Sequence, residues 1–216
     1  ASSHNDFTVT LGYLNMTGNS EKLSHSMNVN YVNHHDKSME HAILQYSNLE
    51  MGVIKQESTH AKFGYAIKKL SDFHFLINGR YDQDNYSGYD NRISYGVGVA
   101  RVLSSEGTSR LTGIFSVDNN GDKPTGKARK DYLSSTLSLM YTKVFNEKVS
   151  LTNSTVFPKA LSNSSYYYDI DTKISYRIGS NWSFSANYDF IHRSETLGGA
   201  YKDTDTRLTL GLTYHR

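Results

Sequence analysis

The chain has 216 residues, a formal net charge of +2 and no cysteine. The balanced charge, with no basic cluster on one predicted strand face, argues against a nucleic-acid binder, and the missing cysteines exclude disulfides and thiolate sites. No run approaches the roughly 18 apolar residues of a membrane-spanning helix. Only 37% of the residues are hydrophobic, yet 17 are tyrosines, a composition typical of a barrel with a polar interior and aromatic girdles.

Twelve segments of about ten residues alternate apolar and polar side chains, which is the two-residue period of a strand. In chain order, strands are predicted at residues 6–15, 22–33, 38–49, 60–68, 73–82, 93–99, 109–117, 133–141, 149–157, 166–178, 182–190 and 207–214. In the third strand, Ile43, Leu44 and Tyr46 break the alternation, so its facing stays open. The seventh strand is short and mixed. Ten strands therefore remain an alternative to twelve.

The predicted connections alternate in length along the chain. Short turns fall near residues 35, 71, 106, 146 and 180, and longer polar loops fall near 18, 54, 87, 124, 161 and 197. The loops predicted at 50–58 and 118–130 belong to the longer set, and the second is the most polar. Outer-membrane barrels combine short turns at one end, longer loops at the other and an even strand count. A soluble sandwich, the alternative, has no reason to sort its loops in this way.

The clearest alternation lies in the segment 166–190, around a predicted short turn. In the hairpin register that this turn sets, Ile170 faces Phe190. Tyr176 faces Phe184 in the same register, so the apolar side chains of both strands share one side. That side suits lipid and the charged side suits a lumen. The sequence therefore predicts an all-β protein, a single transmembrane antiparallel up-and-down barrel of about twelve strands over residues 1–216.

Three parts of the chain carry a family resemblance. They are Leu11-Gly12-Tyr13 with Thr17-Gly18-Asn19-Ser20, then Arg80-Tyr81-Asp82 with Tyr86-Ser87-Gly88-Tyr89-Asp90 and Tyr95-Gly96-Val97-Gly98, and last Thr204-Asp205-Thr206. These motifs resemble the salt-induced outer-membrane proteins of the YdiY-like family, whose function is unknown, and the resemblance covers nearly the whole chain. It implies a barrel in the outer membrane of a Gram-negative bacterium. It implies no activity and no catalytic residue.

Charged residues on the polar parity are predicted to line the lumen. They are Lys62, Lys68, Arg80, Asp82, Arg92, Asp169, Asp171, Lys173, Arg177, Asp189, Asp205 and Arg207. Their signs nearly cancel and no ring of one sign emerges, so strong ion selectivity is not indicated. Because an unpaired buried charge is costly, these residues can form cross-strand networks that fill a narrow barrel. The alternative is a narrow water-filled pore, which twelve strands can enclose.

Two carboxylates, Asp171 and Asp189, face each other in the predicted hairpin. Facing carboxylates can share a proton and act as an acid–base pair. The neighbouring Lys173 and Arg207 favour a structural charge network over that chemistry.

The loop near residue 87 places Tyr86 and Tyr89 on either side of a glycine. Two exposed aromatic rings there can contact a ligand or a partner, or can fold onto the barrel rim.

The remaining candidates for chemistry are weak. The nine histidines show no compact spacing with acidic support, so neither a metal site nor a cofactor is predicted. His192-Arg193-Ser194-Glu195 holds catalytic residue types, but adjacent residues do not make a triad, and no enzyme is predicted. The expected function is a narrow channel for small hydrophilic solutes. The first alternative is a charge-plugged scaffold barrel that anchors envelope partners, and the last is a membrane enzyme. The expected partners are outer-membrane lipid and an envelope protein, and not nucleic acid.

Overall fold

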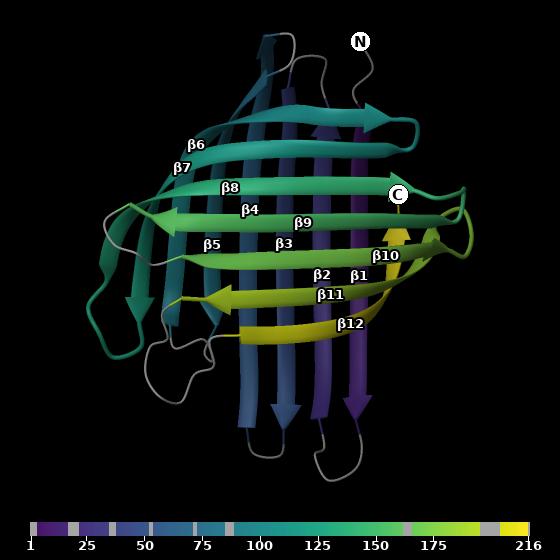
Figure 1. The fold of residues 1–216 in the computed structure, drawn as a ribbon. Helices are drawn as coiled ribbons and strands as arrows, with labels where there is room; N and C mark the ends of the chain where they lie inside the picture. The colour runs from purple at the N-terminus through teal and green to yellow at the C-terminus, as the bar shows by residue number, and fades with distance from the viewer. Residues whose placement is uncertain are drawn as a thin grey trace.

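The computed structural model describes residues 4–16, 22–34, 38–51, 54–70, 73–84, 89–161, 166–194 and 204–215. These residues form twelve strands: β1 (His4–Met16), β2 (Lys22–His34), β3 (Ser38–Met51), β4 (Ile54–Leu70), β5 (Phe73–Asp84), β6 (Tyr89–Glu106), β7 (Ser109–Pro124), β8 (Lys130–Val144), β9 (Val149–Ala160), β10 (Tyr167–Arg177), β11 (Trp182–Arg193) and β12 (Thr204–His215). Each strand pairs with its neighbours in the chain, and β1 pairs with β12 to close the barrel (Figure 1). The predicted twelve-stranded barrel is confirmed. The described residues hold no helix long and apolar enough to cross a membrane.

Closure gives every strand a hydrogen-bonded neighbour on both edges, which the strands need because backbone groups in hydrocarbon must have partners. All neighbouring strands are antiparallel, including the closing pair. The ends of β2, β4, β6, β8 and β10 therefore lie at one end of the barrel, together with the starts of the strands that follow them, and we call this the turn end. The opposite end, where β1, β3, β5, β7, β9 and β11 end, is the loop end.

The hairpin of β10 and β11 has the register expected from the sequence. Ile170 lies opposite Phe190, and Tyr176 lies opposite Phe184. Tyr176 and Phe184 are exposed on the outer surface, whereas Ser185 is buried on the inner one. The same division of apolar outside and polar inside runs round the barrel and leaves almost no apolar core: Ala160 is the one buried hydrophobic residue among those described.

The facing of β3, which the sequence left open, is set by its neighbours. Leu44 and Tyr46 are exposed on the outside. His41 lies on the opposite parity and lines the lumen, so Ile43 shares the inner face. One apolar side chain on the inner face is therefore what disturbed the alternation.

Two predicted loops are wrong. The segment predicted as the loop 118–130 continues β7 as far as Pro124, paired with β6 on one side and β8 on the other. Its outward residues are polar, which hid the strand, and Asn119 donates a hydrogen bond to the Tyr95 hydroxyl at 2.5 Å. The loop predicted at 50–58 is also mostly strand, because β3 ends at Met51 and β4 begins at Ile54.

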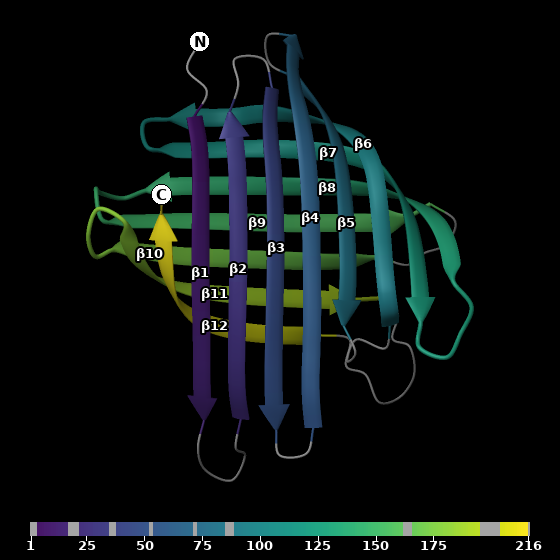
Figure 2. The same cartoon turned by 180° about the vertical axis from the view of Figure 1, so that it is seen from behind.

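The strands of opposite walls of the barrel cross in projection (Figures 1 and 2), as the tilt of strands in a closed barrel requires. Strands β1 to β4 form one wall and β8 to β11 the other, with β12 curving round to reach β1 and with β6 and β7 curving at the opposite corner. Inward glycines lie at both corners. Gly12 pairs with Gly211 at the first. At the second, a Cβ on Gly96 would lie 2.5 Å from the Val117 carbonyl oxygen. Glycine permits this close approach of backbones.

Candidate functional site

An internal cavity of about 1040 Å³ runs along the barrel beside β2 to β10. At the loop end its lining includes Tyr89 and Pro124, and at the turn end it includes Val102 and Arg110. Since β6 and β7 cross the whole barrel between these residues, one cavity reaches from end to end. It lies off centre, away from the closing pair β1–β12, where small buried side chains such as Thr213 pack together.

The charged residues Lys62, Arg80, Asp82 and Arg92 all line this cavity. Asp82 on β5 accepts from two sides. His60 Nδ1 on β4 lies 2.7 Å from its Oδ1, and Arg80 Nε lies 2.5 Å from its Oδ2. The β4–β5 register produces this cluster, because it places His60 opposite Asp82 and Lys62 opposite Arg80.

A second cluster occupies the loop end of the cavity. Arg92 Nε lies 3.7 Å from Asp122 Oδ2, and the Tyr132 hydroxyl donates to the same oxygen at 3.1 Å. The Arg92 guanidinium also lies 3.7 Å from the centre of the Tyr89 ring, within the range of a cation–π contact. Tyr89 is therefore the first residue of β6 at the inner rim, and not a loop residue as the sequence suggested. Tyr86 lies outside the described residues.

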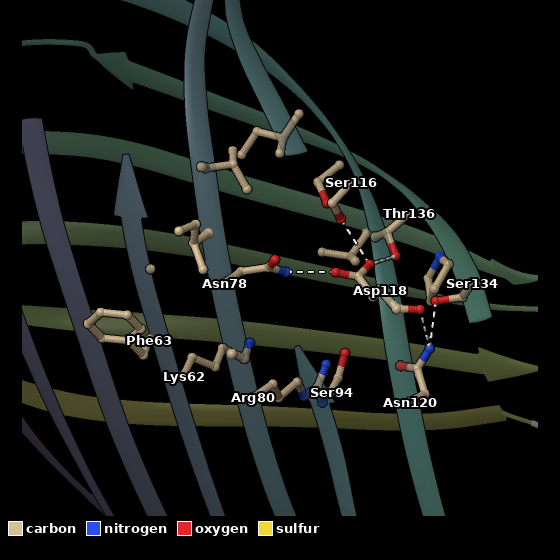
Figure 3. A pocket seen from close by; sticks show the side chains of 18 of the residues that line it. Lys62, Phe63, Asn78, Arg80, Ser94, Ser116, Asp118, Asn120, Ser134 and Thr136 are labelled. Carbon is tan, nitrogen blue, oxygen red and sulfur yellow. Dashed lines mark hydrogen bonds between the residues drawn. The ribbon is translucent and has the colours of Figure 1, made fainter. Parts of the chain in front are cut away.

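A third cluster surrounds the buried carboxylate of Asp118 on β7 (Figure 3). Asn78 Nδ2 donates to it at 2.9 Å, the Ser116 hydroxyl at 2.9 Å and the Thr136 hydroxyl at 2.7 Å. Asn78 reaches Asp118 from β5, two strands away. The register places Gly96 of β6 between them, and the absence of a side chain there opens the path.

The wall formed by β10 and β11 carries carboxylates. Asp171 lies opposite Asp189, as predicted, and Asn187 Nδ2 donates to both, at 3.0 Å and 2.9 Å. Across the lumen, the charges of Asp169 and Asp171 act on Lys62 of β4. The side-chain amide of Asn187 therefore joins the two facing carboxylates, Asp171 and Asp189, in one hydrogen-bonded network.

The other predicted lumen residues are not among the described residues that line the cavity. Lys173 shares the inner parity of β10 with Asp171 and interacts with it electrostatically. Arg177 is exposed at the turn end of β10. Asp205 and Arg207 lie in β12, with Arg207 opposite Asp189. Their side chains, and that of Lys68, lie outside the described part of the structure.

Sequence reasoning missed several polar residues of the cavity. Asp118, Asn120 and Asp122 were assigned to a loop, although they continue the polar parity of Ser116. That run of polar residues at every second position is the signal that could have found them. Asn78 was on the expected inner face, but its contact with Asp118 depends on two hairpin registers and could not be read from one strand.

Two residues of the segment His192-Arg193-Ser194-Glu195, which holds catalytic residue types, make polar contacts with other residues. His192 Nδ1 lies 3.0 Å from the Thr204 hydroxyl, and the Ser194 hydroxyl accepts from the backbone N–H of Tyr166 at 2.8 Å. Glu195 lies outside the described residues. In the part of the chain that the structure describes, no three His, Cys, Asp or Glu residues gather in a way that could hold a metal ion.

Comparison with solved structures supports the fold. The NanC porin superposes with a TM-score of 0.62 at 10% identity, over 96% of this chain and 98% of that one. An outer-membrane channel from Pseudomonas putida F1 gives 0.55 at 9% identity, over 99% and 94% of the chains. The translocator domain of the autotransporter NalP from Neisseria meningitidis gives 0.52 at 11%, over 99% and 88%. At these identities the likeness shows the fold alone.

Among curated proteins, none matches this sequence. Residues 9–215 match the family described as "Protein of unknown function, DUF481", with which the resemblance to the YdiY-like salt-induced outer-membrane proteins is consistent. The match spans all twelve strands apart from the first few residues of β1. The chain is a twelve-stranded transmembrane β-barrel that belongs to the DUF481 family.

Proposed function

We propose that this protein is a narrow channel in the outer membrane of a Gram-negative bacterium, through which small hydrophilic solutes diffuse. The observation that carries the proposal is the cavity that is lined by residues of both barrel ends. Polar side chains recur along its wall among apolar ones, with Asn78, Ser94 and Thr136 between the charged clusters. A path that offers polar groups along its length suits solutes that keep their hydration, as in other barrels with polar interiors.

The outer surface supports the membrane location. Large apolar side chains are exposed on strands all round the barrel, as with Leu11, Val97, Leu137 and Phe184. Exposure on this scale is unfavourable in water and favourable in lipid. The similar structures named above include an outer-membrane channel, which supports the same location. We therefore propose outer-membrane lipid as the medium that covers this surface.

Conductance in planar bilayers tests the channel. The refolded protein is expected to give stable single-channel steps, and the Arg80→Ala, Asp82→Ala double variant is expected to change their size. That pair faces the cavity, so its removal alters both width and charge. The control is the exposed pair Lys123 and Asp90, whose atoms lie 3.1 Å apart outside the cavity. The Lys123→Ala, Asp90→Ala variant should leave conductance unchanged.

One result would contradict the proposed channel function. If the wild-type protein folds, as judged by a heat-modifiable band on gels, and conducts no current, the lumen is closed. That result would favour a second function, a scaffold barrel that anchors an envelope protein. The hydrogen-bonded clusters around Asp82, Asp118 and Asp171 are the observation that supports it, because they occupy much of the inner wall. Recovery of a specific partner with the folded barrel would then be expected.

We propose no enzymatic role. The similar structures named above are described as a porin, a channel and a translocator. The hydroxyl and imidazole groups reported for β11 are engaged with other partners, which gives no reason to propose a nucleophile there.

A further inference from the structure

The described lining of the cavity carries more basic than acidic side chains, and the two signs are unequally exposed. Among the described lining residues, the basic side chains are Lys62, Arg80, Arg92, Arg110 and Lys130, and the acidic ones are Asp82, Asp118 and Asp122. What a solute meets depends on which of these groups reach the cavity with unused hydrogen-bonding capacity.

The acidic groups are covered by the protein. The Asp82 side chain is 11% exposed, that of Asp122 13%, and Asp118 as a residue only 3%. Each already accepts hydrogen bonds or ion pairs: Asp82 from His60 and Arg80, Asp122 from Tyr132 and Arg92, and Asp118 from three neutral donors. Their remaining surface toward the cavity is small.

The two guanidinium groups are more open than these carboxylates. The Arg80 side chain is 30% exposed and that of Arg92 is 24% exposed, more than twice the value of Asp82 and nearly twice that of Asp122 respectively. Each guanidinium contacts its carboxylate through Nε. For Lys62, the described side chains provide no hydrogen bond or ion pair, although several charges act on it from a distance. Figure 3 shows Lys62 and Arg80 reaching side by side into the cavity.

The register gathers these donors into one strip. Lys62 of β4 lies directly opposite Arg80 of β5, and Arg92 of β6 lies opposite Asp82, two residues farther toward the loop end. The carboxylates of the far wall, Asp169, Asp171 and Asp189, do not belong to the described lining of the cavity. A solute following the cavity therefore passes a cationic strip formed by Lys62, Arg80 and Arg92.

We propose that the channel prefers small organic anions that carry a carboxylate over cations and neutral solutes of the same size. The inference rests on the proposed channel function and adds its selectivity. A guanidinium presents paired N–H donors that match the two oxygens of a carboxylate, and a neighbouring ammonium adds a point charge. The cationic strip offers both, and its own carboxylates are already occupied.

Reversal potentials across a bilayer test this selectivity. In a gradient of potassium chloride, the wild-type channel is expected to pass chloride in preference to potassium. Lys62→Gln should lower that preference by about ninefold, because losing one unit charge about 6 Å from an ion in water lowers the local chloride concentration by about threefold and raises that of potassium by about the same factor. The matched control is Lys148→Gln, which removes the same charge from an exposed position in the turn between β8 and β9 and should have no effect.

A second experiment tests whether the channel prefers solutes that carry a carboxylate. Gluconate and glucose share a six-carbon skeleton and differ by the carboxylate. Gluconate added to one side should reduce the chloride current in the wild-type channel, and less so in Lys62→Gln, whereas glucose should not. A channel that conducts but shows equal or cation preference, or equal responses to both sugars, overturns the selectivity and leaves the channel function standing. A folded protein without conductance overturns both.

Discussion

At the scale of single residues, Asp118 shows how a carboxylate is held inside this barrel without a basic partner in contact. Three neutral donors point at its two oxygens from β5, β7 and β8. Hydrogen bonds to a charged group contribute about 1.5–3 kcal/mol each when they replace poorer solvation. The arrangement depends on Gly96, because any side chain on β6 at that point would lie between Asn78 and Asp118.

Gly96→Ala is therefore expected to destabilise the barrel by about 1–3 kcal/mol, the usual cost of forcing a methyl group into a packed site. Its Cβ would lie 2.9 Å from the Asp118 Cα, with the Val117 carbonyl closer still. Urea unfolding in detergent, followed by tryptophan fluorescence or by the heat-modifiable band, measures the loss.

Gly64→Ala is the matched control for this change. Gly64 lies on the same inner face, opposite Asn78, yet its nearest atom would be His41 Nδ1 at 4.0 Å. Its unfolding free energy should change by only a few tenths of a kcal/mol. Equal losses in the two variants would show that glycine is needed for backbone conformation and not for space.

At the scale of strands, alternation predicted the elements well because each strand separates an outer apolar face from an inner polar one. It failed where that division fails. Ile43 places an apolar side chain on the inner face of β3, and Asn119 places a polar one on the outer face of β7. The alternation along one strand indicates only which of its two faces a side chain lies on. An apolar residue on the inner face or a polar residue on the outer face therefore prevents the strand from being predicted correctly.

The contacts within the inner clusters could not be predicted as well from the sequence, because they connect side chains on different strands. The pair His60 and Asp82 requires the register of one hairpin. The contact between Asn78 and Asp118 requires two registers and the glycine between them. The cationic strip further depends on which groups are covered, and parity carries no information about exposure. Residue types on the inner face were therefore predictable, whereas their partners were not.

The closing pair of strands offers a direct test of register. Thr10 Oγ1 of β1 lies 2.7 Å from Thr213 Oγ1 of β12, and the two residues are opposite each other. Because the chain has no cysteine, the Thr10→Cys, Thr213→Cys variant can form only one intramolecular disulfide. Mild oxidation of the folded barrel should form it, since directly opposite positions fit disulfide geometry. Non-reducing electrophoresis of the denatured chain detects the circular product.

The pair Thr8→Cys, Thr213→Cys is the control. Thr8 lies on the same face but opposite His215, which puts its Cα about 7–8 Å from Thr213, beyond the usual reach of a disulfide. Crosslinking of this pair in preference to the first would mean that the barrel closes in a different register.

At the scale of the whole molecule, side chains that reach inward from opposite walls narrow the path through the twelve-stranded barrel. Charges on β10 act on Lys62 of β4, and the open volume lies on the side away from the closing pair β1–β12. The width at that side should therefore control conductance. Ser138 of β8 lines the cavity, whereas its neighbour Leu137 is exposed on the outer face.

Ser138→Trp is expected to reduce single-channel conductance by about half or more, because an indole would occupy much of a path narrow enough to be gated by side chains. Leu137→Trp, which points into lipid, should leave it unchanged. Both variants should retain the heat-modifiable band. An unaltered conductance in Ser138→Trp would place the current somewhere other than the cavity.

The short pairing of β1 with β12 affects the order in which the strands pair during insertion. Only the stretch from Thr8 to Gly12 is in register with β12, whereas β1 pairs with β2 along its whole length. This pairing joins opposite ends of the chain, so its loop-closure entropy is recovered only after the intervening hairpins have formed. Until then both outer strands present unpaired backbone groups to the bilayer. During insertion, the sheet should therefore curve until its two edge strands, β1 and β12, pair last. The same two strands should be the first to separate when the barrel is destabilised.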